Sequence, residues 1–357
     1  MSSPYSAERP SDPAASGPVE HRVAVVVNGN AKNATADVIS TLDQILSGGD
    51  LFVSRKLSDA RHIAKTLVAR GYGTVLTGGG DGTFTIMVTE VVHEARRLGK
   101  AVPRFGLLKL GTGNSLAWVV GAQGADKQDL QADIRRLMED AGSRSMRLIE
   151  VEGFIAPFCG LGADAIVLAD YGKVKGALGK TPLARVAPGP LSYVLAATTR
   201  SIPGLLARKM PHCRVRNDGA DAYRLGAKGA VIGPPIPTGQ TLYEGPMRIC
   251  ALSTIPYYGY GFRMFPYAEE RPDRMNLRIA TIGPLSFIRH FGEIWRGEYE
   301  NEEEITDFLV DAVTIEVDPA SDFQIAGDPR GPRSSISALL SPQPIRLVDF
   351  YAPPHVD

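Results

Sequence analysis

Four apolar runs alternate with amphipathic stretches of helical periodicity between residues 22 and 141. The runs are RVAVVVN (22–28), LFVSRK (51–56), TVLT (74–77) and RFGLLKL (104–110). Strands and helices that alternate in this way form βαβ units, in which helices cover both faces of a parallel sheet. Ligands bind such sheets outside the carboxyl ends of the strands. We therefore expect an α/β domain with a site where these runs end.

The sequence pattern changes near residue 146. Downstream, long helical patterns give way to short β-rich runs separated by prolines, such as MRLIEVEG, MRICALST and AVTIEV. These runs predict a mainly antiparallel β domain. We expect residues 21–146 to form the α/β domain and residues 147–352 the β domain. Residues 1–20 are rich in Ser, Pro and Ala and lack the apolar region of a signal peptide, so we expect a disordered tail.

Composition limits the partners and the compartment. The formal net charge is zero, so we expect no nucleic-acid partner. Three cysteines lie far apart without CxxC spacing, which favours a reducing compartment over a disulfide framework or a zinc site. No apolar run reaches the ~20 residues that a membrane-spanning helix needs. We expect a cytoplasmic protein and any membrane contact to be peripheral.

The loop TGGGDGTF (77–84) follows the third run and precedes a helical pattern. A strand, a glycine-rich loop and a helix N-terminus together form a phosphate cradle, because glycines let backbone N–H groups approach an anion. A carboxylate beside a phosphate is repulsive unless a cation lies between them. Asp81 is therefore expected to act through Mg²⁺, directly or through a water. The alternative is a glycine-rich turn in which Asp81 caps the helix.

Two glycine motifs carry a resemblance to a known family. TGGGDGTF, followed by LLKLGTGNSLA (107–117), resembles the diacylglycerol kinase catalytic family, which includes bacterial lipid kinases and sphingosine kinases. NGNAKN (28–33), FCGLGADAIV (158–167) and residues 243–279 are similar to further segments of that family, in the same order. NAD kinases share Gly-Gly-Asp-Gly-Thr, but the GTGN motif and the later segment favour lipid kinases.

The resemblance implies an architecture and a set of site residues. It implies an N-terminal domain related to phosphofructokinases, a C-terminal β-sandwich, and ATP bound between them with Mg²⁺. The residues implied to hold nucleotide are Asn28, Ser54, Gly79, Gly80, Asp81, Gly82, Thr83, Gly111, Thr112 and Asn114. Asp164 is implied to lie near the lipid headgroup.

One departure concerns the general base. The family places an aspartate near the C-terminus as the base, in an Asp-Gly-Glu motif. The matching stretch, FQIAGDPRG (323–331), puts Ala326 at that position and Asp328 two residues later. Asp328 could serve as the base if the loop shifts by two residues; otherwise Asp328 stabilises a turn beside Gly327 and Pro329.

The resemblance implies an ATP-dependent lipid kinase that acts on a diacylglycerol or a sphingoid lipid at the inner face of a membrane. The resemblance is compatible with a homodimer. Two other functions stay open. One is a non-catalytic lipid- or nucleotide-binding relative, which the alanine at 326 motivates. The other is a kinase for a soluble hydroxyl, as in NAD kinases.

Overall fold

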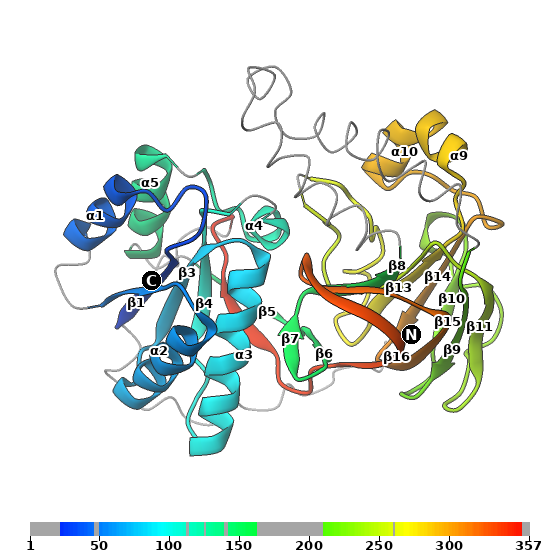
Figure 1. Ribbon diagram of the computed structural model, residues 1–357, viewed down its shortest axis with the longest axis horizontal. Helices are drawn as coiled ribbons and strands as arrows, with labels where there is room; N and C mark the ends of the chain where they lie inside the picture. Colours follow the sequence, from blue (N-terminus) through cyan, green and yellow to red (C-terminus); the bar gives the residue numbers. More distant parts are fainter. Residues whose placement is uncertain are drawn as a thin grey trace, which may run out of the picture.

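The computed structural model describes residues 22–45, 50–111, 114–124, 126–138, 142–162, 210–259 and 261–351. Its strands form a six-stranded sheet and an 11-stranded sheet, one in each half of the molecule (Figure 1). The first half is an α/β domain, and the second is a mainly antiparallel β domain. This confirms the fold class expected from the sequence.

The six-stranded sheet has the order β2-β1-β3-β4-β17-β5. Its four N-terminal strands are parallel to one another: β1 (Val23–Asn28), β2 (Leu51–Ser54), β3 (Thr74–Gly79) and β4 (Arg104–Lys109). The helices are α1 (Ala36–Ile45), α2 (Leu57–Arg70), α3 (Asp81–Leu98), α4 (Ser115–Val120) and α5 (Lys127–Met138). The β-branched run of β1 is buried because helices cover both faces of the sheet.

Two later strands complete this sheet. β17 (Ile345–Val348) pairs parallel with β4, and β5 (Ser143–Met146) pairs antiparallel with β17. Leu347 and Val348 are fully buried there, so the strand contributes to the core of the α/β domain. The range predicted for the second domain, residues 147–352, thus contains one strand of the first sheet.

The 11-stranded sheet is built from antiparallel pairs. Its strands are β6 (Ile149–Val151), β7 (Phe154–Ala156), β8 (Phe158–Gly162), β9 (His212–Asn217), β10 (Tyr223–Leu225), β11 (Thr241–Pro246), β12 (Ile249–Ser253), β13 (Met275–Ala280), β14 (Ile305–Val310), β15 (Ala312–Ile325) and β16 (Asp328–Leu340). A 3-10 turn, η4 (Ala227–Gly229), and two short helices, α9 (Pro284–Arg289) and α10 (Phe291–Arg296), interrupt them.

The hairpin of β15 and β16 connects the two halves of the molecule. It runs from the antiparallel sheet toward α3 (Figure 1). Ile325 pairs with Asp328, so the turn consists of Ala326 and Gly327 alone. Both have positive φ, 50° and 84°, as a type I′ turn requires.

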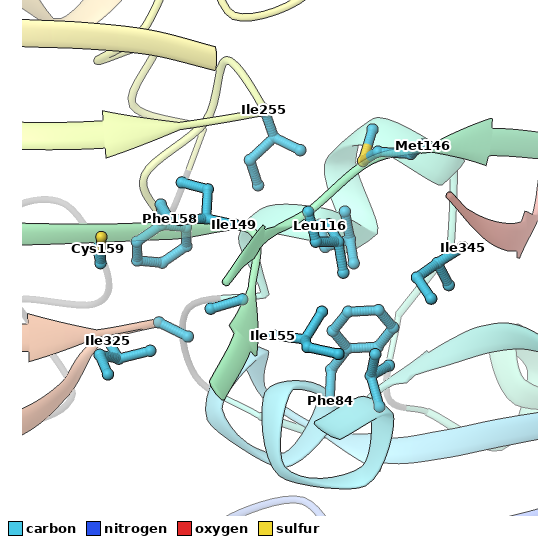
Figure 2. Close-up of a cluster of buried hydrophobic side chains, with 14 of the residues drawn as sticks. Phe84, Leu116, Met146, Ile149, Ile155, Phe158, Cys159, Ile255, Ile325 and Ile345 are labelled. Carbon is cyan, nitrogen blue, oxygen red and sulfur yellow. The ribbon is translucent and has the colours of Figure 1, made fainter. Parts of the chain in front are cut away.

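A shared core lies between the two sheets. Figure 2 shows Phe84 of α3 and Leu116 of α4 in one cluster with Ile155, Phe158 and other buried side chains of the β domain. The backbone N–H of Ile155 also donates to Thr89 Oγ1 of α3, at 2.9 Å. The two halves are therefore held together by apolar packing and by a buried hydrogen bond.

Within the described residues, every helix falls short of the length and apolar character that crossing a membrane requires.

Candidate functional site

The carboxyl ends of β1, β2 and β3 converge on the start of α3. β1 ends at Asn28 and β2 at Ser54, and both residues line a cavity of about 140 Å³ together with Thr83. Asn28 Nδ2 donates to Thr83 Oγ1 at 3.0 Å, which fixes both side chains. The structure thus brings together three residues that lie in separate segments of the sequence.

The same cavity has a basic side that the sequence reasoning missed. Its lining residues are Asn28, Asn30, Ser54, Arg55, Lys56, Leu57, Ala60, Thr83, Ile86 and Met87. The run LFVSRK predicts that Arg55 and Lys56 belong to a strand, but β2 ends at Ser54, so both lie in the loop before α2. Asp59 Oδ2 accepts both of their backbone N–H groups, at 2.9 and 3.0 Å, and holds that loop. The basic residues at the end of the run LFVSRK were the signal that could have revealed this side.

The glycines of the two loops permit close backbone approach. A Cβ on Gly79 would stand 2.4 Å from Thr83 Oγ1, and a Cβ on Gly111 would stand 2.3 Å from the Cα of Gly80. The N–H of Gly111 donates to the carbonyl of Gly79 at 2.9 Å. The two glycine loops therefore pack directly against each other; a larger residue at position 111 would separate them, and one at position 79 would collide with Thr83.

Asp81 is buried and caps a helix other than its own. Its Oδ2 accepts the N–H of Ser115 at 2.8 Å, and its Oδ1 accepts the N–H of Leu116 at 3.1 Å, so the carboxylate lies at the start of α4. The residue before α4, Asn114, is left-handed (φ 43°) and donates through Nδ2 to the carbonyl of Gly111 at 2.8 Å. Burial raises the pKa of Asp81 above its usual value, and the charge of Asp328 adds to the rise.

Asp328 lies at the tip of the β15–β16 hairpin, against the first turn of α3. A Cβ on Gly82 would stand 2.6 Å from Asp328 Oδ2. Burial raises the pKa of Asp328, and the positive charge of Arg330 opposes the rise. No described residue donates a hydrogen bond to this carboxylate; the N–H of Gly327 instead donates to Gln324 Oε1, at 2.8 Å. The turn is therefore held without the carboxylate of Asp328, which leaves that group available to a ligand.

Ala326 occupies the turn itself. Its N–H donates to the carbonyl of Phe158 at 3.0 Å, which ties the turn to β8. Two other predicted site residues, Thr112 and Asp164, lie outside the described residues.

The positions of Asp81 and Asp328 are relevant to the magnesium ion that the sequence predicts. In the described part of the chain, no group of three or more His, Cys, Asp or Glu side chains could hold a metal by itself. Asp81 and Asp328 are close enough for the charge of one to shift the pKa of the other. Magnesium is usually held by one or two carboxylates together with waters and substrate phosphates, so a magnesium ion at this place would depend on a bound phosphate.

Comparison with known proteins gives a family match over the first domain. Residues 22–150 match the family model of the diacylglycerol kinase catalytic domain. A solved structure of a diacylglycerol kinase from Bacillus anthracis str. Sterne is 13% identical, with 92% of this chain and 96% of that chain covered and a TM-score of 0.57. An NAD kinase from Archaeoglobus fulgidus, solved in complex with ATP, is 10% identical over 91% of this chain and 93% of its own, with a TM-score of 0.43. No curated protein matches the chain.

The structural likeness at these identities shows the fold, while the family match supports a phosphotransferase of the kinase type.

Proposed function

We propose, from the premise that residues 22–150 form a domain of the diacylglycerol kinase catalytic family, that the protein is an ATP-dependent lipid kinase. It transfers the γ-phosphate of ATP to the hydroxyl of a diacylglycerol or of a sphingoid-type lipid. The observation that carries this proposal is the position of Asp328. Its carboxylate has no hydrogen-bond donor among the described residues and lies over Gly82, at the N-terminal turn of α3.

Asp328 is suited to the role of general base. A base must be near the proton that it accepts, and it works best when its pKa lies closer to the operating pH than that of an exposed carboxylate. Burial raises the pKa of Asp328 in that direction. In phosphoryl transfer, positioning and charge neutralisation dominate, and the base orients the hydroxyl and takes its proton late.

The nucleotide would occupy the ends of β1, β2 and β3. Asn28, Ser54 and Thr83 supply polar groups there, and Arg55 and Lys56 supply positive charge toward phosphates. The backbone of Gly79 to Gly82 leads into the N-terminus of α3, whose dipole favours an anion. Gly111, Thr112 and Asn114 would border the same region from the second glycine loop.

Asp81 would serve the nucleotide site indirectly. Both of its oxygens already accept an N–H from α4, so a magnesium ion would be reached through water. Magnesium, when bound, neutralises phosphate charge and polarises the transferred group. The carboxylate of Asp81 meanwhile keeps α4, and with it the second glycine loop, in position.

The β domain would supply the acceptor side. Asp164 is proposed to lie near the lipid headgroup, with residues 147–352, apart from β17, forming the acceptor domain and residues 21–146 the nucleotide domain. The protein would bind its lipid substrate at the inner face of a membrane, through peripheral contact.

A non-catalytic nucleotide-binding protein is the second candidate, because Ala326 stands where the family has its base. Both functions predict that ATP stabilises the fold. Only the kinase predicts turnover that depends on Asp328.

The test is incubation of the protein with labelled ATP, Mg²⁺ and detergent micelles that carry single lipids: diacylglycerols, sphingoid bases and ceramide. NAD without detergent serves as the soluble acceptor. We expect label in one lipid class, and we expect Asp328→Asn to lose that label while ATP still raises its melting temperature. Absence of labelled lipid, with ATP stabilisation intact, would support the non-catalytic protein instead.

A further inference from the structure

A second cavity, of about 310 Å³, lies between the edge strand β5 and the segment 268–274 of the β domain. Its lining residues are Arg144, Ser145, Met146, Arg147, Thr254, Ala268, Glu269, Arg271, Pro272, Arg274 and Pro344. None of these residues belongs to the candidate kinase site.

The lining is strongly basic. It contains four arginines and one carboxylate, Glu269, which is an excess of three positive charges. Arg144 Nη2 donates to Glu269 Oε1 at 2.5 Å, so this carboxylate is already engaged. Arg147 is exposed and forms no ion pair with another described residue.

Two of the arginines are held in fixed orientations. The guanidinium carbons of Arg271 and Arg274 lie 4.6 and 5.9 Å from the ring centroid of Tyr223. Asp273, outside the lining, pairs with Arg274 Nη1 at 2.7 Å and lies 3.5 Å from Arg271 Nε. Guanidinium groups that are oriented in this way lose less entropy when they bind an anion.

Arg274 has a hydrogen-bond donor left over. Its side chain is 10% exposed, and its Nε–H is buried without a hydrogen-bond partner. Its Nη1 and Nη2 donate to Asp273 and to the carbonyl of Asp221. A buried donor of a charged group without a partner is costly, so the guanidinium of Arg274, which lines the cavity, is not fully satisfied by its protein partners.

We propose that this cavity is a binding site for a phosphate-bearing anion, with Arg147 and Arg274 as its principal ligands. Arginine pairs with phosphate through parallel N–H groups, and the hydroxyls of Ser145 and Thr254 offer further donors. The volume admits a phosphomonoester with a small organic group. The phosphate can come from a soluble compound or from the headgroup of a phospholipid, because the recognised chemistry is the same.

A bound anion would link the two halves of the molecule. Arg144 and Arg147 lie on or beside β5 of the six-stranded sheet, whereas Arg271 and Arg274 belong to the β domain. The ion pair of Arg144 with Glu269 already crosses this junction. We therefore expect occupancy to raise the melting temperature of the whole chain. This expectation is independent of lipid phosphorylation.

The experiment measures melting temperature and binding by calorimetry with inorganic phosphate, with glycerol 3-phosphate, and with phosphatidylcholine vesicles with or without phosphatidate. Arg147→Gln and Arg274→Gln are compared with wild type and with Arg214→Gln, an arginine of β9 outside the cavity. Arg147 is exposed, so its variant should fold even if the Arg274 variant does not.

We expect at least one phosphate source to bind wild type and Arg214→Gln, and to bind the Arg147 variant at least about tenfold more weakly. Binding of the soluble phosphates identifies a soluble ligand, and binding of phosphatidate vesicles alone identifies a lipid headgroup. Equal binding by all variants would assign the anion to another site and overturn the proposal. Absence of binding from every source would overturn it as well.

Discussion

Asp328, at the tip of the β15–β16 hairpin, lies against the Cα of Gly82 in the first turn of α3. A Cβ on Gly82 would stand 2.6 Å from Asp328 Oδ2 and 3.0 Å from its Cγ. The glycine in the middle of the sequence motif is therefore matched to a carboxylate from the other domain. This contact explains why residue 82 has no side chain, whether or not a phosphate also needs close approach to the backbone there.

Gly82→Ala should displace the carboxylate of Asp328. Misplacing a reactive group by about 1 Å can cost roughly 10²-fold in rate, so we expect a loss of that order in turnover. The fold should persist, because alanine favours a helix over glycine by about 1 kcal/mol. Steady-state kinetics and thermal melting check both parts.

The matched control is Gly292→Ala in α10, where the nearest atom to a new Cβ is Arg296 Nη1, at 3.4 Å. It should leave turnover unchanged. Equal turnover in Gly82→Ala and in wild type would show that the position of Asp328 does not matter for the reaction.

Asp328→Asn should lower kcat by about 10²- to 10⁴-fold, because the amide cannot accept the hydroxyl proton. The dissociation constant for ATP should change little, since the cavity formed by Asn28, Ser54 and Thr83 stays intact. Asp322→Asn, on the same hairpin, is the control. A kcat that is the same in both variants would remove Asp328 from the role of base.

The low-pH side of the plot of rate against pH should shift when the charge beside Asp328 is removed. The base is active when ionised, so the rate falls as pH drops through the pKa of Asp328. Burial raises this pKa and the charge of Arg330 lowers it. Arg330→Met removes the positive charge and keeps an apolar side chain near Phe154, over which the guanidinium lies at 4.2 Å.

We expect the acidic limb of kcat/KM in Arg330→Met to shift to higher pH, with the plateau rate little changed. The measurement is the pH dependence of kcat/KM for both proteins in buffers of equal ionic strength. A shift to lower pH would mean that a different group titrates in that limb.

Local sequence patterns were sufficient to predict the parallel core. The β-branched run at residues 22–28 and the glycine loops are short-range signals, and the topology of parallel sheets then places their ends together. Asn28 and Thr83 meet as this reasoning predicts. The sequence could not show that β17 returns to the first sheet, because strand pairing over such a separation depends on the tertiary fold.

The contacts of Asp81 and Asp328 also depend on the tertiary fold and could not be predicted from local sequence. The sequence predicts that Asp81 acts through Mg²⁺ or caps its own helix, and it does not show that the carboxylate accepts N–H groups from α4, a contact between distant segments. For Asp328, the sequence identified the residue but not its place over Gly82, which depends on a two-residue turn.

Asp133 of α5 should make stability depend on pH. Its side chain is fully buried, Oδ2 accepts the N–H of Gln123 at 3.0 Å, and Oδ1 has no partner. Burial raises its pKa from 3.8 to about 6. The folded state therefore holds the proton more tightly than the unfolded state, and this residue's contribution to stability is lost as pH rises through that interval.

Asp133→Asn keeps the acceptor for Gln123 and removes the charge. Its melting temperature should rise relative to wild type by a few degrees as pH goes from about 4 to about 7, because a 1 kcal/mol change shifts Tm by roughly 2–4 °C. The control is Asp43→Asn, at an exposed aspartate of α1. A difference from wild type that is constant with pH would show that Asp133 does not titrate in this range.

Ala326→Gly should stabilise the hairpin that positions Asp328. Ala326 has a φ of 50°, and a left-handed conformation costs a residue with a Cβ about 1 kcal/mol that glycine does not incur. Ala326 is buried, so removal of its methyl group offsets part of this gain. We expect the free energy of unfolding to rise by about 0.5 kcal/mol, measured by urea denaturation.

Gly327→Ala tests the same turn in the opposite direction. Gly327 has a φ of 84°, and no atom lies within 4 Å of a Cβ built there, so any loss of stability comes from the backbone alone. We expect a loss of about 1 kcal/mol or more. If Ala326→Gly instead destabilises the protein, packing of the Ala326 methyl group outweighs the cost of its left-handed backbone at the tip of the hairpin.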